Sequence, residues 1–317
     1  MALDLKSANL LARARRAFGE HEVGEAVAKF RAIIGPPLIP LSEPDAQSAW
    51  NKLENGEDPT PLELASLELV IRLMRPAPLS ENGKLADLPD DAGEGLFPAE
   101  LKDLWTAFRQ KANPLLFSIA RIETRAHELI GTGFLVADRL LATNRHVLGA
   151  LTSGSEVLAP GQARALFKFE YTGSEPDEHT ADLDGVAAVH PTLDMVLLRV
   201  AASPRPALEI EPVPAQPGER MVAIGYPGRD PFRNPAFLEA IYQGKYEVKR
   251  AALGEVLDGA ATPVLFHDAS TTGGNSGSPL LSLLTGRVVG IHRAGFFMYR
   301  NEAIDAQHVQ KFIHAST

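Results

Sequence analysis

A serine flanked by glycines carries the clearest chemical signal in this sequence. It lies in the run Thr271-Thr272-Gly273-Gly274-Asn275-Ser276-Gly277-Ser278-Pro279. A serine hydroxyl attacks a carbonyl only when a nearby base takes its proton, and the oxyanion that forms must be met by backbone N–H groups. Glycines permit the tight loop that aims the N–H groups of Gly274 and Ser276 into one hole. Taken alone, the run also fits a glycine-rich turn that happens to contain a serine.

A histidine that follows two short strands is the candidate base. Residues 131–136 and 140–142 form a predicted hairpin, and His146 comes just after its second strand. A positioned imidazole is the usual base at neutral pH. The chain has nine histidines, so His146 by itself also fits an ordinary surface or core residue.

An aspartate at the start of a predicted strand is the candidate orienting acid. Asp194 comes immediately before the apolar run 195–200. A buried acid there can hold the histidine ring in the correct tautomer, although an isolated aspartate at this place also fits a strand cap. Asp182 and Asp184 are weaker rivals, because no comparable strand follows them directly.

The order of these residues joins the three signals into one prediction. His146, Asp194 and Ser276 follow each other as histidine, aspartate and serine, which is the order of the chymotrypsin arrangement. Their separations are wide enough for the three residues to come from two barrels.

At this point a family resemblance is visible. Residues 112–317 resemble the trypsin-like, chymotrypsin-fold serine peptidases, and are most similar to the cysteine-free bacterial branch that includes the glutamyl endopeptidases. Asn275 stands where animal enzymes have aspartate, and Val147 where they have cysteine, as in that branch. The matching runs are Gly131-Thr-Gly-Phe with Ala142-Thr-Asn-Arg-His-Val, Ser270-Thr-Thr-Gly-Gly-Asn-Ser-Gly-Ser-Pro, and Gly290-Ile-His-Arg-Ala-Gly.

The resemblance implies a mainly β fold of two six-stranded antiparallel barrels, with the triad in the cleft between them. It assigns His146 as base, Asp194 as its orienting acid and Ser276 as nucleophile. The oxyanion hole would be formed by the N–H groups of Gly274 and Ser276. No metal and no cofactor are expected.

The resemblance also places a substrate pocket. Ser270 and Thr271 would line it, and Ser270 argues against cleavage after Arg or Lys, which calls for an aspartate. His292 falls where glutamyl endopeptidases meet the substrate carboxylate, so cleavage after Glu is expected, unless His292 only packs the pocket wall. Arg293 replaces the usual tryptophan, and would favour acidic substrates only if it points inward. Backbone groups from Arg293 to Gly295 would pair with an extended substrate.

The elements that position these residues change character near residue 112. Before it the apolar spacing is helical, at 7–18, 22–34, 64–74 and 101–108. Thr60-Pro61-Leu62-Glu63 is a predicted capping box. Residues 76–98, rich in Pro, Gly and acid, predict a long loop or linker. After residue 112, short apolar runs at 134–136, 140–142, 195–200, 221–224 and 288–291 predict strands.

Composition limits the protein class. The 317 residues include no cysteine, carry a formal net charge of −9, and are 45% hydrophobic. A disulfide framework is therefore excluded, and a nucleic-acid partner is not expected. No secretory signal and no apolar run long enough to span a membrane are visible. These features predict a cytoplasmic, bacterial protein.

The sequence leaves three functional hypotheses open. The first is a serine endopeptidase that hydrolyses proteins or peptides through an acyl-enzyme on Ser276. The second is a catalytically silent peptide-binding adaptor in a bacterial stress or defence system, and the third is an enzyme that stays latent until triggered. Residues 1–111 are interpreted as an accessory or regulatory helical region that could bind a protein partner, and residues 90–95 as a self-cleavage site if acidic preference holds.

Overall fold

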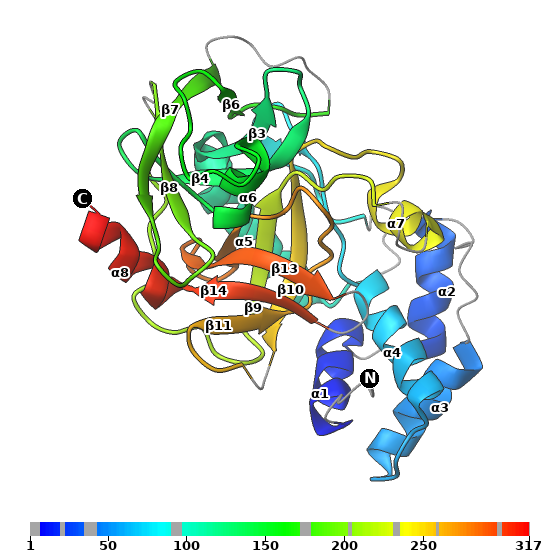
Figure 1. The fold of residues 1–317 in the computed structure, drawn as a ribbon. Helices are drawn as coiled ribbons and strands as arrows, with labels where there is room; N and C mark the ends of the chain where they lie inside the picture. Colours follow the sequence, from blue (N-terminus) through cyan, green and yellow to red (C-terminus); the bar gives the residue numbers. More distant parts are fainter. Residues whose placement is uncertain are drawn as a thin grey trace.

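The structure is a computed structural model that describes residues 7–19, 23–34, 43–89, 97–171, 179–201, 205–230, 235–257, 260–296 and 300–316. Its centre is a pair of closed barrels, each made of six antiparallel strands (Figure 1). The predicted double-barrel fold class is therefore confirmed.

The first barrel has the strand order β3-β4-β5-β8-β7-β6. Its strands are β3 Ile119–Thr124, β4 Leu129–Ala137, β5 Leu140–Thr143, β6 Ala163–Leu166, β7 Thr180–Val189 and β8 Val196–Val200. The runs predicted at 134–136, 140–142 and 195–200 fall in β4, β5 and β8. Met195 lies just outside β8, because its N–H closes a turn with the carbonyl of Leu193 at 2.8 Å.

The second barrel has the order β10-β11-β14-β13-β12-β9. Its strands are β9 Arg220–Gly225, β10 Arg250–Leu257, β11 Val264–His267, β12 Pro279–Ser282, β13 Val288–Phe296 and β14 Arg300–Asp305. The runs predicted at 221–224 and 288–291 fall in β9 and β13.

Helices surround the barrels. They are α1 Ser7–Phe18, α2 Val23–Ile34, α3 Glu43–Glu54, α4 Pro61–Leu73, α5 Ala99–Ala112, α6 Arg145–Leu151, α7 Pro235–Tyr242 and α8 Ala306–Ser316, with a 3-10 helix η1 at Asn113–Ser118. The capping box is confirmed, since Thr60 Oγ1 accepts from Glu63 N and Glu63 Oε2 accepts from Thr60 N. None of the described helices is both long and apolar enough to cross a membrane.

The first four helices form a layer on one side of the second barrel (Figure 1). Leu10 and Phe18 of α1 and Ile71 of α4 belong to the same buried apolar cluster as Val222 and Ile304 of the barrel. The first barrel has a separate core around Leu135 and Leu198. The helical layer therefore shares its core with the second barrel, while the first barrel is filled by its own strands.

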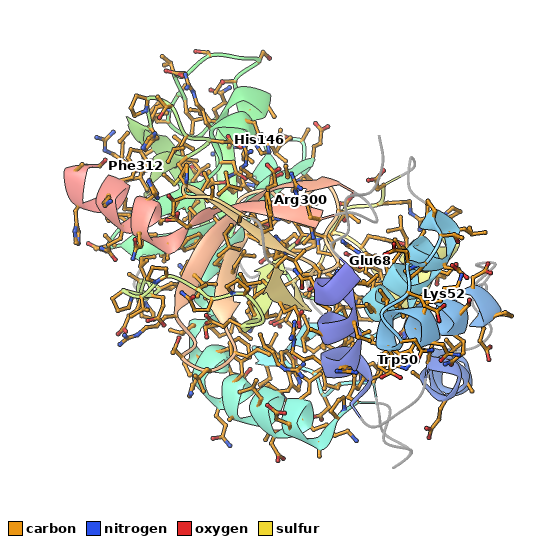
Figure 2. All side chains as sticks on the ribbon, turned by 90° about the horizontal axis from the view of Figure 1, so that it is seen from below. Trp50, Lys52, Glu68, His146, Arg300 and Phe312 are labelled. Carbon is orange, nitrogen blue, oxygen red and sulfur yellow. The ribbon has the colours of Figure 1, made fainter. Side chains whose placement is uncertain are left out.

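A buried set of charges also joins the layer to that barrel. We call it the arginine–carboxylate network. Its members are Arg13 and Arg16 of α1, Glu68 and Arg72 of α4, Arg75, Glu255 of β10 and Asp268. Glu68 lies where α4 meets α1 (Figure 2). Except for Arg16, these residues are almost completely buried. Removing one partner of a buried pair leaves an uncompensated charge, so the network fixes how the helices dock.

The first part of the predicted linker is held against β10. The carbonyls of Pro76 and Pro78 each accept from a β10 N–H, on Leu253 and Ala251, at 2.9 Å. A short hairpin follows, with strands β1 Ser80–Glu81 and β2 Lys84–Leu85. The run 90–95, where self-cleavage was considered, lies outside the described residues. The division of the chain at residue 111 stays a prediction.

The capping box gives a stability prediction. Thr60→Ala removes the hydroxyl that satisfies the N–H of Glu63, and we expect the free energy of unfolding to fall by about 1 kcal/mol. Urea unfolding followed by circular dichroism measures the change. Thr106→Ala, at an exposed position within α5, is the matched control. Equal midpoints for the two variants would contradict the predicted role of the cap.

Candidate active site

Strand pairing brings the candidate histidine and aspartate together. β5 pairs with β8 so that Thr143 lies opposite Val196. His146 follows β5 in the first turn of α6, and Asp194 lies in the turn that leads into β8. His146 Nδ1 and Asp194 Oδ2 are 2.7 Å apart, and His146 N donates to Asp194 Oδ1 at 3.0 Å. The aspartate thus holds both the ring and the backbone of the histidine.

The rival acids lie elsewhere in the first barrel. Asp182 pairs with Arg125 at 2.7 Å, and Asp184 pairs with Arg139 at 3.4 Å. Neither contacts His146, so the geometry favours Asp194 over both.

The serine loop is a tight turn between β11 and β12. Asn275 N donates to the carbonyl of Thr272 at 3.1 Å, which closes a four-residue turn. Gly274, the third residue of this turn, has φ +91°, the positive value that type II turns require at that position. A Cβ at Gly274 would lie 2.3 Å from the carbonyl oxygen of Tyr226. Any larger residue would therefore displace the loop that carries Ser276.

The peptide between Gly273 and Gly274 is fixed in orientation. Its carbonyl accepts from Gly228 N at 2.6 Å. Because the C=O and N–H of a trans peptide point in opposite directions, the N–H of Gly274 points away from Gly228. Within the described residues, the N–H groups of Gly274 and Ser276 make no hydrogen bond.

Thr132 of β4 fastens this loop to the first barrel. Its N–H donates to the carbonyl of Ser276 at 2.8 Å, and its Oγ1 donates to the carbonyl of Gly274 at 2.7 Å. Tyr226 N donates to the same hydroxyl at 3.2 Å. One threonine therefore links the strand next to His146 with the loop that carries the serine.

The serine lies beside the chain segment that holds the histidine. A Cβ at Gly131 would lie 3.0 Å from the carbonyl oxygen of Ser276 and 2.8 Å from the side chain of Val147, the neighbour of His146. Ser276 Oγ makes no hydrogen bond to another described residue. The hydrogen bond between a catalytic serine and its histidine often forms only when substrate is bound. His146 is exposed on the first barrel (Figure 2).

The residues expected in the substrate pocket are buried together on the second barrel. Ser270, Thr271 and His292 are each no more than 4% exposed. His292 Nδ1 lies 3.1 Å from Nε2 of His267, a residue of β11. Ser270 Oγ has no hydrogen-bond partner among the described residues, while the carbonyl of Ser270 accepts from Tyr242 at 2.8 Å.

Arg293 and Gly295 lie on β13 beyond the part that pairs with β12, which ends at Ile291. One edge of this stretch is therefore not used by β12. Arg293 itself forms an ion pair with Glu302 of β14 at 2.5 Å. Its positive charge is therefore balanced within the barrel.

Three positioning residues were not singled out from the sequence. Thr132 and Asn144, whose Nδ2 donates to the carbonyl of Asp194 at 3.0 Å, both lie in the matching runs, so proximity to the signals could have indicated them. His267 had no signal, because it meets His292 only through the pairing of β11, β14 and β13. In the described part of the chain, no three acidic or histidine side chains form a possible metal site.

Comparison with known proteins agrees with this fold. Residues 131–291 match the model of the trypsin-like peptidase domain. The serine protease Rv3671c of Mycobacterium tuberculosis is 29% identical over 184 residues, which cover 56% of this chain and 39% of that protein. The same figures hold for serine protease MT3772 from another strain of that species. The chain thus spans well under half the length of these relatives.

Two solved structures are also similar to this chain at lower identity. A serine endoprotease from Yersinia pestis has a TM-score of 0.48 and 19% identity, covering 66% of this chain and 65% of its own. An inactive form of the Rv3671c protease has a TM-score of 0.45 and 22% identity, covering 65% of this chain and 91% of its own. Since the matched model includes 131–291, half of the 317 residues, the chain belongs to the trypsin-like peptidase domain family.

Proposed function

We propose that this protein is a serine endopeptidase with Ser276 as nucleophile, His146 as base and then acid, and Asp194 as the group that orients His146. The observation that carries the proposal is the pair of contacts between Asp194 and His146, at 2.7 and 3.0 Å, beside a serine loop tied to the same barrel by Thr132.

The reaction follows from these positions. His146 takes the proton of Ser276 as Oγ attacks the scissile carbonyl, and the resulting imidazolium is stabilised by the Asp194 carboxylate. The tetrahedral intermediate collapses when His146 gives this proton to the leaving amine. Water then attacks the acyl-enzyme with His146 again acting as base, which releases the acid and restores Ser276.

The N–H groups of Gly274 and Ser276 would stabilise the oxyanion. The Gly273 carbonyl is held by Gly228, which fixes the Gly274 N–H on the opposite side of the same peptide. Donors fixed before the reaction cost no reorganisation when charge develops. This geometry supports a loop already set for catalysis, in preference to a latent enzyme that needs a separate event to order it.

We further propose that the pocket accepts an acidic side chain at P1, the residue before the scissile bond. A buried hydroxyl without a partner is uncommon in folded proteins, and Ser270 Oγ is such a group among the described residues. A carboxylate would accept a hydrogen bond from it and from His292. A backbone substrate strand would pair with β13 between Arg293 and Gly295.

The histidine pair supports this pocket through its tautomers. Burial lowers the pKa of His267 to about 3, so this ring is neutral and can donate from only one nitrogen. When His267 Nε2 donates to His292 Nδ1, the proton of a neutral His292 is placed on Nε2. That tautomer offers an N–H rather than a lone pair to a substrate carboxylate.

The nucleophile is tested with a fluorophosphonate probe and a peptide substrate. We expect the native chain to label covalently, and Ser276→Ala to lose labelling and to lower kcat by about 10³-fold or more. Ser278→Ala, two residues further along the loop, keeps the nucleophile and controls for loop mutation. Native protein that never labels would instead favour the silent adaptor.

The pocket is tested with a mixed peptide library read by mass spectrometry. We expect cleavage after Glu or Asp, and Ser270→Ala to lower kcat/KM for a Glu peptide by about tenfold or more, since a hydrogen bond to a charge is lost. A matched Gln peptide should change less. Cleavage only after Arg or after apolar residues would remove the proposed acidic preference.

The buried histidine predicts a pH dependence of stability. Below the usual histidine pKa of about 6.5 the unfolded chain takes up a proton that folded His267 does not, so stability falls with decreasing pH by about 1.4 kcal/mol per unit. We expect His267→Gln to reduce this slope between pH 6.5 and 5. Urea midpoints measure it, with the exposed His314→Gln as control. Identical slopes in native protein and His267→Gln would contradict a neutral, buried His267.

A further inference from the structure

The arginine–carboxylate network reaches the chain segment that forms the proposed P1 pocket. Asp268 follows His267 directly and lies two residues before Ser270. Its Oδ2 accepts from Arg13 of α1 at 2.9 Å and from Arg75 at 3.3 Å, and its Oδ1 accepts from Glu255 N at 2.7 Å. Arg13 of α1 and Arg75, which follows α4, therefore hold the residue two positions before Ser270.

Asp268 cannot find substitute partners in water. It is fully buried, and so are Glu68 and Glu255, the other acids of the network. Burial by itself raises the pKa of Asp268, but the guanidinium groups of Arg75 and Arg13 hold that pKa below its usual range. A buried carboxylate that stays charged depends on these arginines. Their position therefore determines where Asp268 lies.

Ala269 and Ser270, the two residues after Asp268, are held closely, so a shift at Asp268 would pass along the segment. A Cβ at Gly254 of β10 would lie 2.6 Å from the backbone N of Ala269. The carbonyl of Ala269 accepts from Asn301, and that of Ser270 from Tyr242. Because these residues have little free space around them, a displacement of Asp268 would be passed on to the serine loop.

The helices do not contact the reacting residues themselves. Glu68 and His146 lie far apart in the molecule (Figure 2). The buried core and the charges that the helical layer shares with the second barrel give it a route to the site. The segment from Asp268 to Ser276 is the direct covalent route, and His267, bonded to His292, lies at its start.

We propose that Arg13 and Arg75 are positioning residues of the protease: through Asp268 they set the P1 wall around Ser270 and, with it, the loop that carries Gly274 and Ser276. This inference rests on the proposed function. On this inference the helical layer helps to position the active site, in addition to packing on the second barrel.

Three arginines of α1 allow a matched test. Arg13→Met removes the contact with Asp268 together with two hydrogen bonds to Glu68, and leaves three arginines to balance three buried carboxylates. Arg16→Met removes a pair with Glu255, at 2.7 Å, without touching Asp268. Arg15→Met removes an exposed pair with Glu54. Arg13→Lys keeps the positive charge and tests rescue.

Two measurements are made on variants of the 317-residue chain at a temperature where all are folded. Hydrogen exchange reports amide protection of residues 268–276, and steady-state kinetics with a cleaved peptide reports kcat and KM. For Arg13→Met we expect about tenfold faster exchange in this segment and about tenfold lower kcat/KM. Arg13→Lys should recover part of both losses. Arg15→Met and Arg16→Met should match the native protein.

The outcomes separate this inference from the proposed function. If Arg13→Met matches the native protein in exchange and kinetics, or if Arg16→Met loses as much as Arg13→Met does, the positioning role is overturned. If the native protein is inactive and unlabelled, the proposed function fails. Faster exchange confined to 268–276 in Arg13→Met would then still support the link from the helices to this segment.

Discussion

The site depends on the hydrogen bonds of Thr132. The candidate base and its aspartate belong to the first barrel, whereas the serine belongs to the second. Thr132 uses its N–H and its hydroxyl to hold two carbonyls of the serine loop, on Ser276 and Gly274. The packing around this joint leaves no spare space, since a Cβ at Gly277 would lie 2.1 Å from the Thr132 carbonyl oxygen. The separation of base and nucleophile is therefore set by one residue of β4 and the glycines that face it.

Local signals in the sequence predicted the parts of the fold and of the site whose geometry is local. The turn at Gly274, the helix start at Thr60 and the strand that follows Asp194 depend on nearby residues, and the structure contains each of them. The pairing of His146 with Asp194 required more, namely the knowledge that β5 lies beside β8. The family resemblance supplied that knowledge, because residue spacing alone does not determine which strands are neighbours.

Contacts between distant segments could not be predicted in this way. Nothing near His267 marks it as the partner of His292, and nothing near Asp268 indicates that its counterions lie in the first helices. Residues 76–78 show the same difficulty, since a run rich in proline predicts a loop but here supplies carbonyls to β10. In each case the partner is specified by the completed barrel and not by the local sequence.

The arginine–carboxylate network joins residues far apart in the sequence, which has a consequence for folding during translation. Arg13 and Asp268 are separated by 255 positions, and a chain is synthesised from its N-terminus. During translation the first helices emerge with arginines whose barrel carboxylates have not yet been made. Those carboxylates belong to the stretch that also ends in the serine loop. Docking of these helices and completion of the candidate site thus wait for the same stretch of chain, so neither is reached in a nascent chain before residues 255–276 have been made.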